Sequence, residues 1–181
     1  SGGGSHGAIN VSTALEVSCN YFFYETSYRM GNTAEGTATN SIETIKKYAE
    51  AFGLDNYTGV EIGEYAPKIA SPEYKEKISQ TRWTDGDTIR AAIGQSVNNY
   101  APVHMAKYVA TLANGGTRYT MHMIDRVETA DGIVTEQKTT TVESNIDIKE
   151  ENPNAVYQGM LAVTSGSRGN LRKVFKDFPI K

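Results

Sequence analysis

The sequence predicts an α+β fold that is mainly helical, with one β-hairpin near residues 118–138. Apolar residues recur at helical spacing in several stretches, most clearly after Asn40 and after Pro102. One Asp-Gly pair, Asp131-Gly132, separates two stretches rich in β-forming residues, which is the usual signal of a hairpin. The 181 residues are 39% hydrophobic and 22% charged, which is typical of one globular domain or a large piece of one.

Charge and composition exclude several classes of protein. The net charge of -3 provides no basic surface that would attract nucleic acid, so no nucleic-acid partner is expected. The single cysteine, Cys19, excludes an intrachain disulfide and a four-cysteine zinc site. No apolar run approaches the roughly 20 residues that span a membrane. Residues 1–5 are expected to be a flexible linker introduced by cloning, with a native glycine-rich loop as the alternative.

Helix signals dominate the first third of the chain. We predict helices over residues 12–17, 20–30 and 40–52, the second and third ended by Gly31 and Gly53. Thr13 and Glu16 have the spacing of a capping box at the start of the first helix. The second helix is rich in aromatic residues, and its apolar side is expected to face a core.

The middle of the chain combines a long connection with a strong helix. Residues 66–87 show little periodicity and are predicted to form a surface connection with one helical turn at 72–78, and a further turn is expected at 87–92. Residues 102–114 form a helix with proline at its first position and glycines after its end. Its apolar residues define a stripe that should face the core: Val103, Ala106, Val109, Ala110 and Ala113.

The last third is predicted to alternate between strands and helices. Residues 118–129 and 133–138 form the two arms of the hairpin, and residues 139–145 form an exposed strand or a loop. A helix follows over residues 152–164, and a last amphipathic helix over residues 171–178.

Ser18-Cys19-Asn20 interrupts the first helical region. Residues two apart in an α-helix point to opposite sides, so Ser18 and Asn20 can act together only where the chain leaves helical geometry. A turn between two helices would aim both polar side chains into one cleft while Cys19 packs inward. The alternative is a plain helix junction that the Ser18 or Asn20 side chain caps.

A few side chains have the chemistry of metal ligands. The candidates are His6, His104, His122 and Cys19. His104 and His122 flank a helix and the following strand, so one hypothesis is that they approach each other and bind zinc. The alternative is a buried thiol and ordinary histidines. We predict no metal and no cofactor.

Several motifs occur in an order that resembles penicillin-binding protein transpeptidase domains of the class B, monofunctional type. The resemblance begins with His6-Gly7, Ala14-Leu15 and Ser18-Cys19-Asn20 followed by aromatic residues. It continues in family order with four more segments: Ala51 to Leu54 with Thr58 to Val60, Ile93 to Gln95, Ala101 to Ala106, and Leu112 to Gly116. Ala101 and His104 depart from the family pattern. The resemblance implies the helical subdomain of a penicillin-binding/serine transpeptidase α/β fold over residues 6–181.

Two further motifs of that family are missing from the sequence. No Ser-x-x-Lys occurs, and the nearest segments, Thr44 to Lys47 and Thr135 to Lys138, have threonine in place of the serine nucleophile. No Lys-Thr-Gly occurs either; in the family it follows a helix like the one predicted at 171–178. We therefore expect residues 6–181 to be an interior part of a transpeptidase domain that lacks both segments.

The resemblance implies a peptidoglycan D,D-transpeptidase that cross-links stem peptides through a serine acyl-enzyme and binds β-lactam antibiotics. Ser18 and Asn20 would be both catalytic and substrate-binding residues. The remaining segments of the domain would be further partners, and an N-terminal helix outside this sequence would anchor the parent at the extracytoplasmic face of the bacterial membrane. This chain alone would be inactive. The alternatives are a non-catalytic helical interaction module and a β-lactamase or β-lactam sensor.

Overall fold

The computed structural model describes residues 5–31, 38–148 and 151–178, so the predicted linker lies outside the described residues except for Ser5. The elements follow one another as α1 Val11–Glu16, α2 Asn20–Gly31, α3 Ala38–Ala51, α4 Pro72–Ser79, α5 Asp85–Ala91, α6 Pro102–Ala113, β1 Thr117–Tyr119, β2 Arg126–Glu128, β3 Val134–Gln137, β4 Val142–Asn145 and α7 Glu151–Ser165. The prediction of a mainly helical α+β fold is confirmed. No helix in these ranges is both long and apolar enough to cross a membrane.

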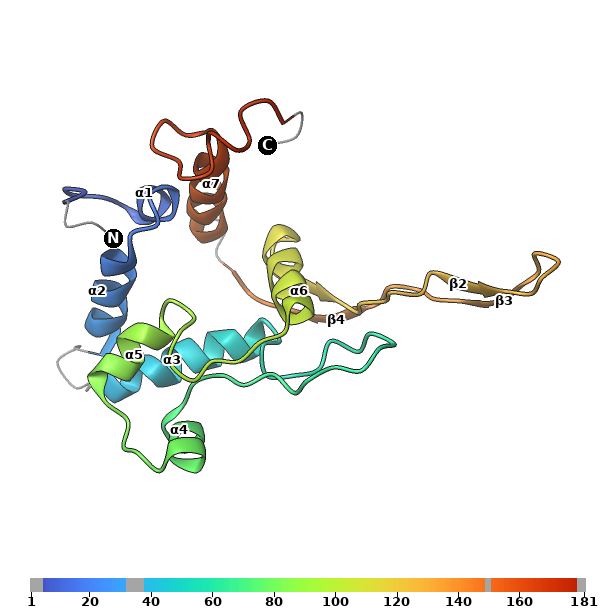
Figure 1. Cartoon of the computed structure of the whole chain (residues 1–181), viewed down its shortest axis with the longest axis horizontal. Helices are drawn as coiled ribbons and strands as arrows, with labels where there is room; N and C mark the ends of the chain where they lie inside the picture. Colours follow the sequence, from blue (N-terminus) through green and yellow to red (C-terminus); the bar gives the residue numbers. More distant parts are fainter. Residues whose placement is uncertain (1–4, 32–37, 149–150, 179–181) are drawn as a thin grey trace.

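Five of the helices form two packed groups, and the strands form an extended ribbon (Figure 1). Helices α2, α3 and α5 pack together, while α1 packs against α7, far away in the sequence. The small core among the first group consists of Ile42, Ala70 and Ala91, with Ile45, Trp83 and Val97 packed against it. Trp83 therefore covers the helical core.

Most helix boundaries follow the predicted signals. Gly53 and Gly115, which were predicted to end these helices, adopt positive φ two residues after the ends of α3 and α6. The predicted capping box at the start of α1 is wrong, because Asn10 is the N-cap and its side chain accepts from the Thr13 N–H at 2.9 Å. Ser71 caps α4 in the same way, so the single turn predicted there is a helix of eight residues.

The hairpin is confirmed, and it is the tip of a longer ribbon. Strands β2 and β3 pair antiparallel around the turn that contains Gly132, which has φ +84°. Strand β1 pairs with β4, so residues 139–145, predicted as an exposed strand or loop, include a strand at the base of the ribbon. The segment between α3 and α4 is tied to this ribbon, because the Met123 N–H donates to Glu61 Oε2 at 3.0 Å.

Helix α6 buries the opposite face from the one predicted. His104, Lys107 and Thr111 are buried, whereas the apolar face with Met105 and Val109 is exposed to solvent, each at 41%. The reason is the neighbours of α6: Lys107 Nζ donates to the Thr58 carbonyl at 3.2 Å and pairs with Glu143 Oε1 at 2.7 Å. The two oxygens compensate the cost of burying the ammonium group of Lys107. With an apolar residue at position 107, these oxygens would lose their partner.

Two other sequence predictions are wrong. In α2 the fully buried residues are Ser27 and Gly31, because α2 meets α3 through its small residues. Of its aromatic residues, Phe22, Phe23 and Tyr24 are half-buried, and Tyr21 and Tyr28 are exposed. Ser41 Oγ donates to the Ser27 carbonyl at 2.5 Å at this contact. Residues 171–178 form a series of turns in place of a helix. A segment this short lacks enough hydrogen bonds to offset helix nucleation without a packed face.

Candidate functional site

The Ser18-Cys19-Asn20 triplet lies at the junction of two helices, as predicted. Helix α1 ends at Glu16 and α2 begins at Asn20, so both predicted site residues belong to one sharp turn. Ser18 has φ +54°, in the left-handed region that residues with a Cβ atom adopt only at a cost of about 1–2 kcal/mol.

Backbone hydrogen bonds hold this turn in a Schellman motif. The Ser18 N–H donates to the Leu15 carbonyl at 3.1 Å, and the Cys19 N–H donates to the Ala14 carbonyl at 2.8 Å. This pattern satisfies the last carbonyls of α1 and normally places glycine where Ser18 lies. The chain thus has a serine, with its hydroxyl, at a position where the backbone conformation favours glycine.

The side chains of the triplet differ in exposure. Ser18 and Asn20 are exposed and Cys19 is half-buried. Within the described ranges neither the Ser18 hydroxyl nor the Asn20 amide makes a hydrogen bond to the protein. The junction is therefore capped by the Ser18 backbone, and the alternative in which a side chain of Ser18 or Asn20 caps a helix is not what the structure has.

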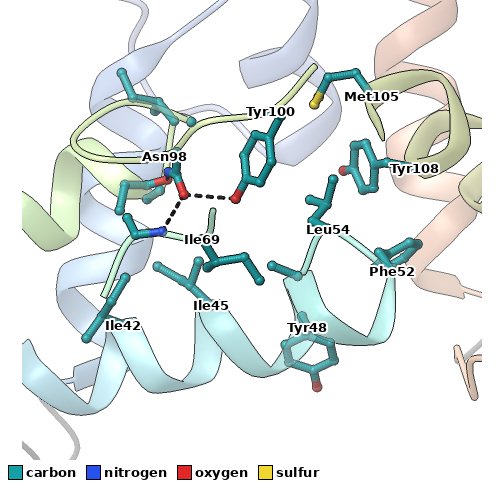
Figure 2. A pocket seen from close by; sticks show the side chains of 16 residues that line it. Ile42, Ile45, Tyr48, Phe52, Leu54, Ile69, Asn98, Tyr100, Met105 and Tyr108 are labelled. Atoms are coloured by element: carbon teal, nitrogen blue, oxygen red, sulfur yellow. Dashed lines mark hydrogen bonds between the residues drawn. The ribbon is translucent and has the colours of Figure 1, made fainter. Parts of the chain in front are cut away.

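A cavity of 590 Å³ lies elsewhere, between α3, α5 and α6 (Figure 2). Its walls are mostly apolar, and Asn98 supplies the main polar group: Asn98 Oδ1 accepts from the Ala70 N–H at 2.7 Å and from the Tyr100 hydroxyl at 2.8 Å. Burial raises the pKa of Tyr100 to about 12, so this phenol stays protonated and donates at neutral pH. Neither Ser18 nor Asn20 lines this cavity.

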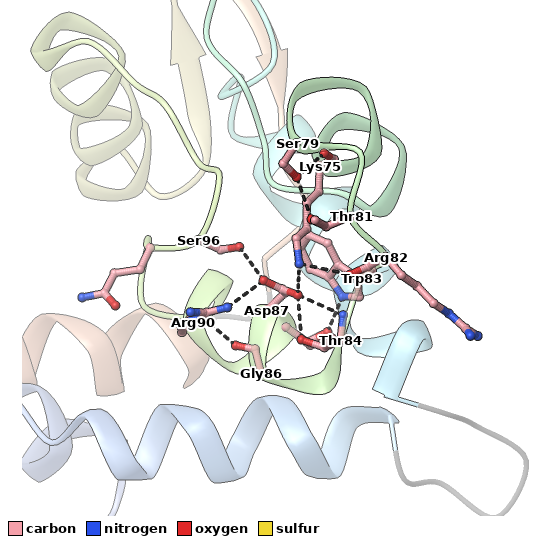
Figure 3. A network of polar contacts seen from close by, with 12 residues as sticks. Lys75, Ser79, Thr81, Arg82, Trp83, Thr84, Gly86, Asp87, Arg90 and Ser96 are labelled. Carbon is pink, nitrogen blue, oxygen red and sulfur yellow. Dashed lines mark hydrogen bonds and ion pairs between the residues drawn. The ribbon is translucent and has the colours of Figure 1, made fainter.

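A buried carboxylate organises the connection between α4 and α5 (Figure 3). Asp87, 2% exposed, accepts from Lys75 Nζ at 2.6 Å, from the Thr84 N–H at 2.9 Å and from Thr84 Oγ1 at 2.7 Å, while Arg90 Nη2 reaches its other oxygen at 2.8 Å. Burial raises the pKa of Asp87, but the Lys75 and Thr84 hydrogen bonds outweigh it and hold this pKa well below its usual range. The spacing of Thr84 and Asp87 is that of a capping box, a signal that sequence reasoning missed.

The two histidines considered as zinc ligands have separate partners. His104 Nε2 lies 3.4 Å from Glu64 Oε2, and His122 Nδ1 lies 3.1 Å from Glu61 Oε1. Burial raises the pKa of Glu64, but the Thr58 and Gly59 N–H groups lower it to a net value below the usual range. The N–H of Met123 and the ring of His122 lower the pKa of Glu61 to about 2.

Each of these contacts pairs one histidine with one carboxylate. Among the residues that the structure describes, no group of three or more His, Cys, Asp or Glu side chains has the geometry of a metal site. The structure thus does not bring His104 and His122 together as ligands.

The family profile described as "Penicillin binding protein transpeptidase domain" matches residues 3–181. Peptidoglycan D,D-transpeptidase MrdA of Salmonella typhimurium is 27% identical over 175 residues, which are 96% of this chain and 26% of that protein. The chain therefore spans about a quarter of the length of this relative.

Solved structures of penicillin-binding proteins share the fold. Penicillin-binding protein 2B of Streptococcus pneumoniae matches with a TM-score of 0.70 and 23% identity, over 89% of this chain and 26% of that one. PBP2 of Pseudomonas aeruginosa, solved in complex with WCK 5153, matches with a TM-score of 0.72 and 24% identity, over 93% of this chain and 36% of that one. The resemblance predicted from the sequence is confirmed over nearly the whole chain. The chain belongs to the penicillin-binding protein transpeptidase family, in its class B branch.

Proposed function

We propose that this chain is the part of a peptidoglycan D,D-transpeptidase that contributes the Ser-x-Asn element of the active site. The remaining segments of the domain supply the Ser-x-x-Lys nucleophile and the Lys-Thr-Gly strand, which this sequence lacks. The substrates are peptidoglycan stem peptides, and β-lactam antibiotics are recognised at the same site. The parent protein works at the extracytoplasmic face of the membrane, where an N-terminal helix anchors it.

The proposed reaction is acyl transfer through a serine acyl-enzyme. The nucleophilic serine attacks the carbonyl carbon of the D-Ala-D-Ala bond, and its proton passes through the lysine and the Ser18 hydroxyl to the leaving amine. A hydroxyl suits this relay because it accepts one proton while it donates another. The Asn20 amide donates and accepts hydrogen bonds, which suits it to orient the substrate amide beside the lysine. An acceptor amine then attacks the acyl-enzyme and completes the cross-link.

The observation that carries this proposal is the conformation of the triplet. Ser18 keeps a left-handed φ of +54° in a helix-ending motif that favours glycine, and its hydroxyl and the Asn20 amide are both exposed and free of protein partners in the described ranges. Backbone strain that is retained together with an unused polar group is typical of a functional site. A purely structural junction would gain stability from glycine at this position.

The test measures penicillin acylation by the full-length protein and its Ser18→Ala and Asn20→Ala variants. Loss of a relay group typically slows proton transfer about a hundred- to ten-thousand-fold, so Ser18→Ala should slow acylation by a factor in this range. Neither variant should lose more than about 0.5 kcal/mol of stability, because neither side chain is bonded to the protein. Normal acylation by both variants would refute the proposal.

Ser96→Ala provides a matched control for these variants. Ser96 is a second serine in the left-handed region, with φ +64°, and lies in the turn after α5. Its hydroxyl lies 3.5 Å from Asp87 Oδ1 and is not part of the Ser18-Cys19-Asn20 turn. Its replacement removes the same chemical group from the same backbone conformation, and it should leave the acylation rate unchanged.

A second experiment tests whether the nucleophilic serine lies in another segment of the domain. The chain by itself should form no covalent adduct with a reactive penicillin, because it contains no Ser-x-x-Lys serine. Intact-mass spectrometry after incubation detects such an adduct directly. A one-to-one gain of the penicillin mass, mapped to a serine of this chain, would contradict the assignment of the nucleophile to another segment.

A further inference from the structure

The position of the Ser18 turn depends on contacts between α1 and the segment around the end of α7. Helix α1 has only six residues, which is too short to be stable by itself, and α7 is the element packed along it. Near the start of α1, Ser12 Oγ donates to the Ala155 carbonyl at 2.6 Å. One residue before the end of α1, Leu15 lies against Gly159, where an added Cβ atom would lie 2.8 Å from Leu15 Cδ1.

The end of α1 has its own contact, made by Glu16. Glu16 Oε1 accepts from the backbone N–H of Arg168 at 2.9 Å, across 152 residues of sequence. Gly166 leaves the room for this carboxylate, since a Cβ atom there would overlap Glu16 Oε1. The loop that presents the N–H is itself closed by hydrogen bonds from the Gly169 N–H to the Gly166 carbonyl at 3.2 Å and from the Leu171 N–H to the Val163 carbonyl at 3.0 Å.

The helix dipoles do not favour a carboxylate at this place. Glu16 is the last residue of α1, and the loop that it contacts follows the end of α7, so the carboxylate lies near the negative ends of two helix dipoles. Neither helix has a basic residue in its last turn to compensate. Within the described ranges the hydrogen bond from Arg168 is the contact that accounts for a glutamate here.

Glu16 is also two residues from the strained position of the candidate site. The Schellman bonds of the turn begin at the carbonyls of Ala14 and Leu15, which belong to the same last turn of α1. A displacement of this turn therefore moves Ser18 and Asn20 directly. Reacting groups must be held within about 0.5 Å of the productive geometry, and a misplacement of about 1 Å costs on the order of a hundred-fold in rate.

We propose that Glu16 is a positioning residue, which holds the Ser18-Asn20 turn in its active geometry by tying α1 to the backbone of the loop at residues 166–169. This inference rests on the proposed function, because the effect acts through Ser18 and Asn20. Glu16 does not contact the substrate. Its contribution is the fixed position of the turn during acylation.

The test uses the full-length protein and separates the acylation rate constant from the noncovalent binding constant for a penicillin. Glu16→Ala removes the acceptor and should slow acylation roughly ten- to a hundred-fold, with little change in binding. Glu16→Gln keeps an oxygen that accepts from the Arg168 N–H, and it should retain a rate within about three-fold of the original.

Two controls separate positioning from loss of folding. Glu50→Ala removes a carboxylate from the last turn of α3 that makes no hydrogen bond or ion pair among the described residues, and it should leave the rate unchanged. The fraction of enzyme acylated at completion counts the folded molecules, so the rate constant refers to those molecules alone. A normal rate constant in Glu16→Ala, or a loss confined to the acylated fraction, would overturn the inference.

A double-mutant cycle separates this inference from the proposed function. If Glu16 acts through the turn, Glu16→Ala should slow acylation little further when Ser18 and Asn20 are already alanine. If Ser18→Ala and Asn20→Ala slow acylation and Glu16→Ala does not, the positioning role is rejected and the proposed function stands. If Glu16→Ala slows acylation and both Ser18→Ala and Asn20→Ala acylate at the normal rate, the positioning role and the proposed function are both rejected.

Discussion

Ser18 combines an unfavourable backbone conformation with an exposed hydroxyl, and the two can be separated by mutation. Ser18→Gly should raise the free energy of unfolding by about 0.5–1 kcal/mol, because glycine adopts positive φ without a Cβ clash and loses only part of this gain to its backbone entropy. Urea unfolding of the full-length protein measures the change. Gln80→Gly, at φ +53° on an exposed residue whose side chain makes no hydrogen bond within the described ranges, is the matched comparison and should show a gain of similar size. A loss of stability in Ser18→Gly would mean that the Ser18 side chain has a structural partner.

Asp87 is the residue whose removal should destabilise the helical core most. Asp87→Asn leaves Lys75, whose side chain is only 15% exposed, without its ionic partner, and we expect a loss of about 3 kcal/mol at pH 7. Asp85→Asn, at an exposed position two residues earlier in α5, is the control and should cost less than about 1 kcal/mol.

The same residue predicts a pH dependence. The folded-state pKa of Asp87 lies below the unfolded value of 3.8, so its stabilising contribution is fully present above that value and is lost as the pH falls toward the folded-state pKa. The difference in unfolding free energy between wild type and Asp87→Asn should therefore be constant from pH 7 to about pH 5 and shrink below about pH 4. Urea unfolding across this range measures it, and a difference that does not shrink would show that Asp87 acts by shape alone.

At the scale of elements, the contact between α1 and α7 depends on a glycine. A Cβ atom at Gly159 would lie 2.8 Å from Leu15 Cδ1 and 2.9 Å from the Ser12 carbonyl oxygen, which is part of the backbone and cannot easily move. Gly159→Ala should therefore cost about 1–3 kcal/mol, although alanine favours helix by up to about 1 kcal/mol at this interior position.

Thermal unfolding of the full-length protein tests this expectation. Gly63→Ala is the matched control, because Gly63 has ordinary φ and an added Cβ atom there meets nothing within 4 Å. The control should change stability by less than about 0.5 kcal/mol. Equal stability of Gly159→Ala and the control would show that α1 can move away from α7 without loss.

At the scale of the whole molecule, the chain exposes more surface than a compact protein of its size. Its accessible surface is 11988 Å², against about 8,600 Å² expected for a monomeric globular protein of 19.8 kDa. Large apolar side chains are exposed on α6 and α7 and along the ribbon, including Met105, Val109, Met160, Leu161 and Val134. This surface is what the proposed neighbouring segments of the domain would cover.

The isolated chain should therefore self-associate between micromolar and millimolar concentrations, as measured by light scattering. Replacing Met105 and Val109 by lysine breaks the apolar face of α6, since the two residues are four apart and share that face, and it should reduce association. Lysines at Asn154 and Gln158, two exposed polar residues of α7 with the same spacing, add the same charge and should reduce association less. A monomer throughout this range would count against an incomplete domain.

Local signals in the sequence were sufficient to predict where most of the helices and strands lie. The glycines after α3 and α6, the proline that opens α6 and the Asp131-Gly132 pair all act within a few residues, so their effect is the same in any surroundings. The interruption at Ser18-Cys19-Asn20 was predicted from the same kind of local reasoning. Its role in the reaction rests on family resemblance and stays a prediction.

Tertiary structure decided which faces are buried and what holds the candidate site. Helical periodicity correctly located apolar positions on α6, but burial depends on the neighbours, and here the carbonyl of Thr58 and the carboxylate of Glu143 select the face with Lys107. The contact of Glu16 with Arg168 joins residues 152 apart. The sequence by itself thus determined where helices, turns and the ribbon form, because those depend on backbone preferences over a few residues. Only the fold determined the buried faces and the position of the Ser18 turn, because burial and hydrogen-bond pairing depend on segments that are distant along the chain.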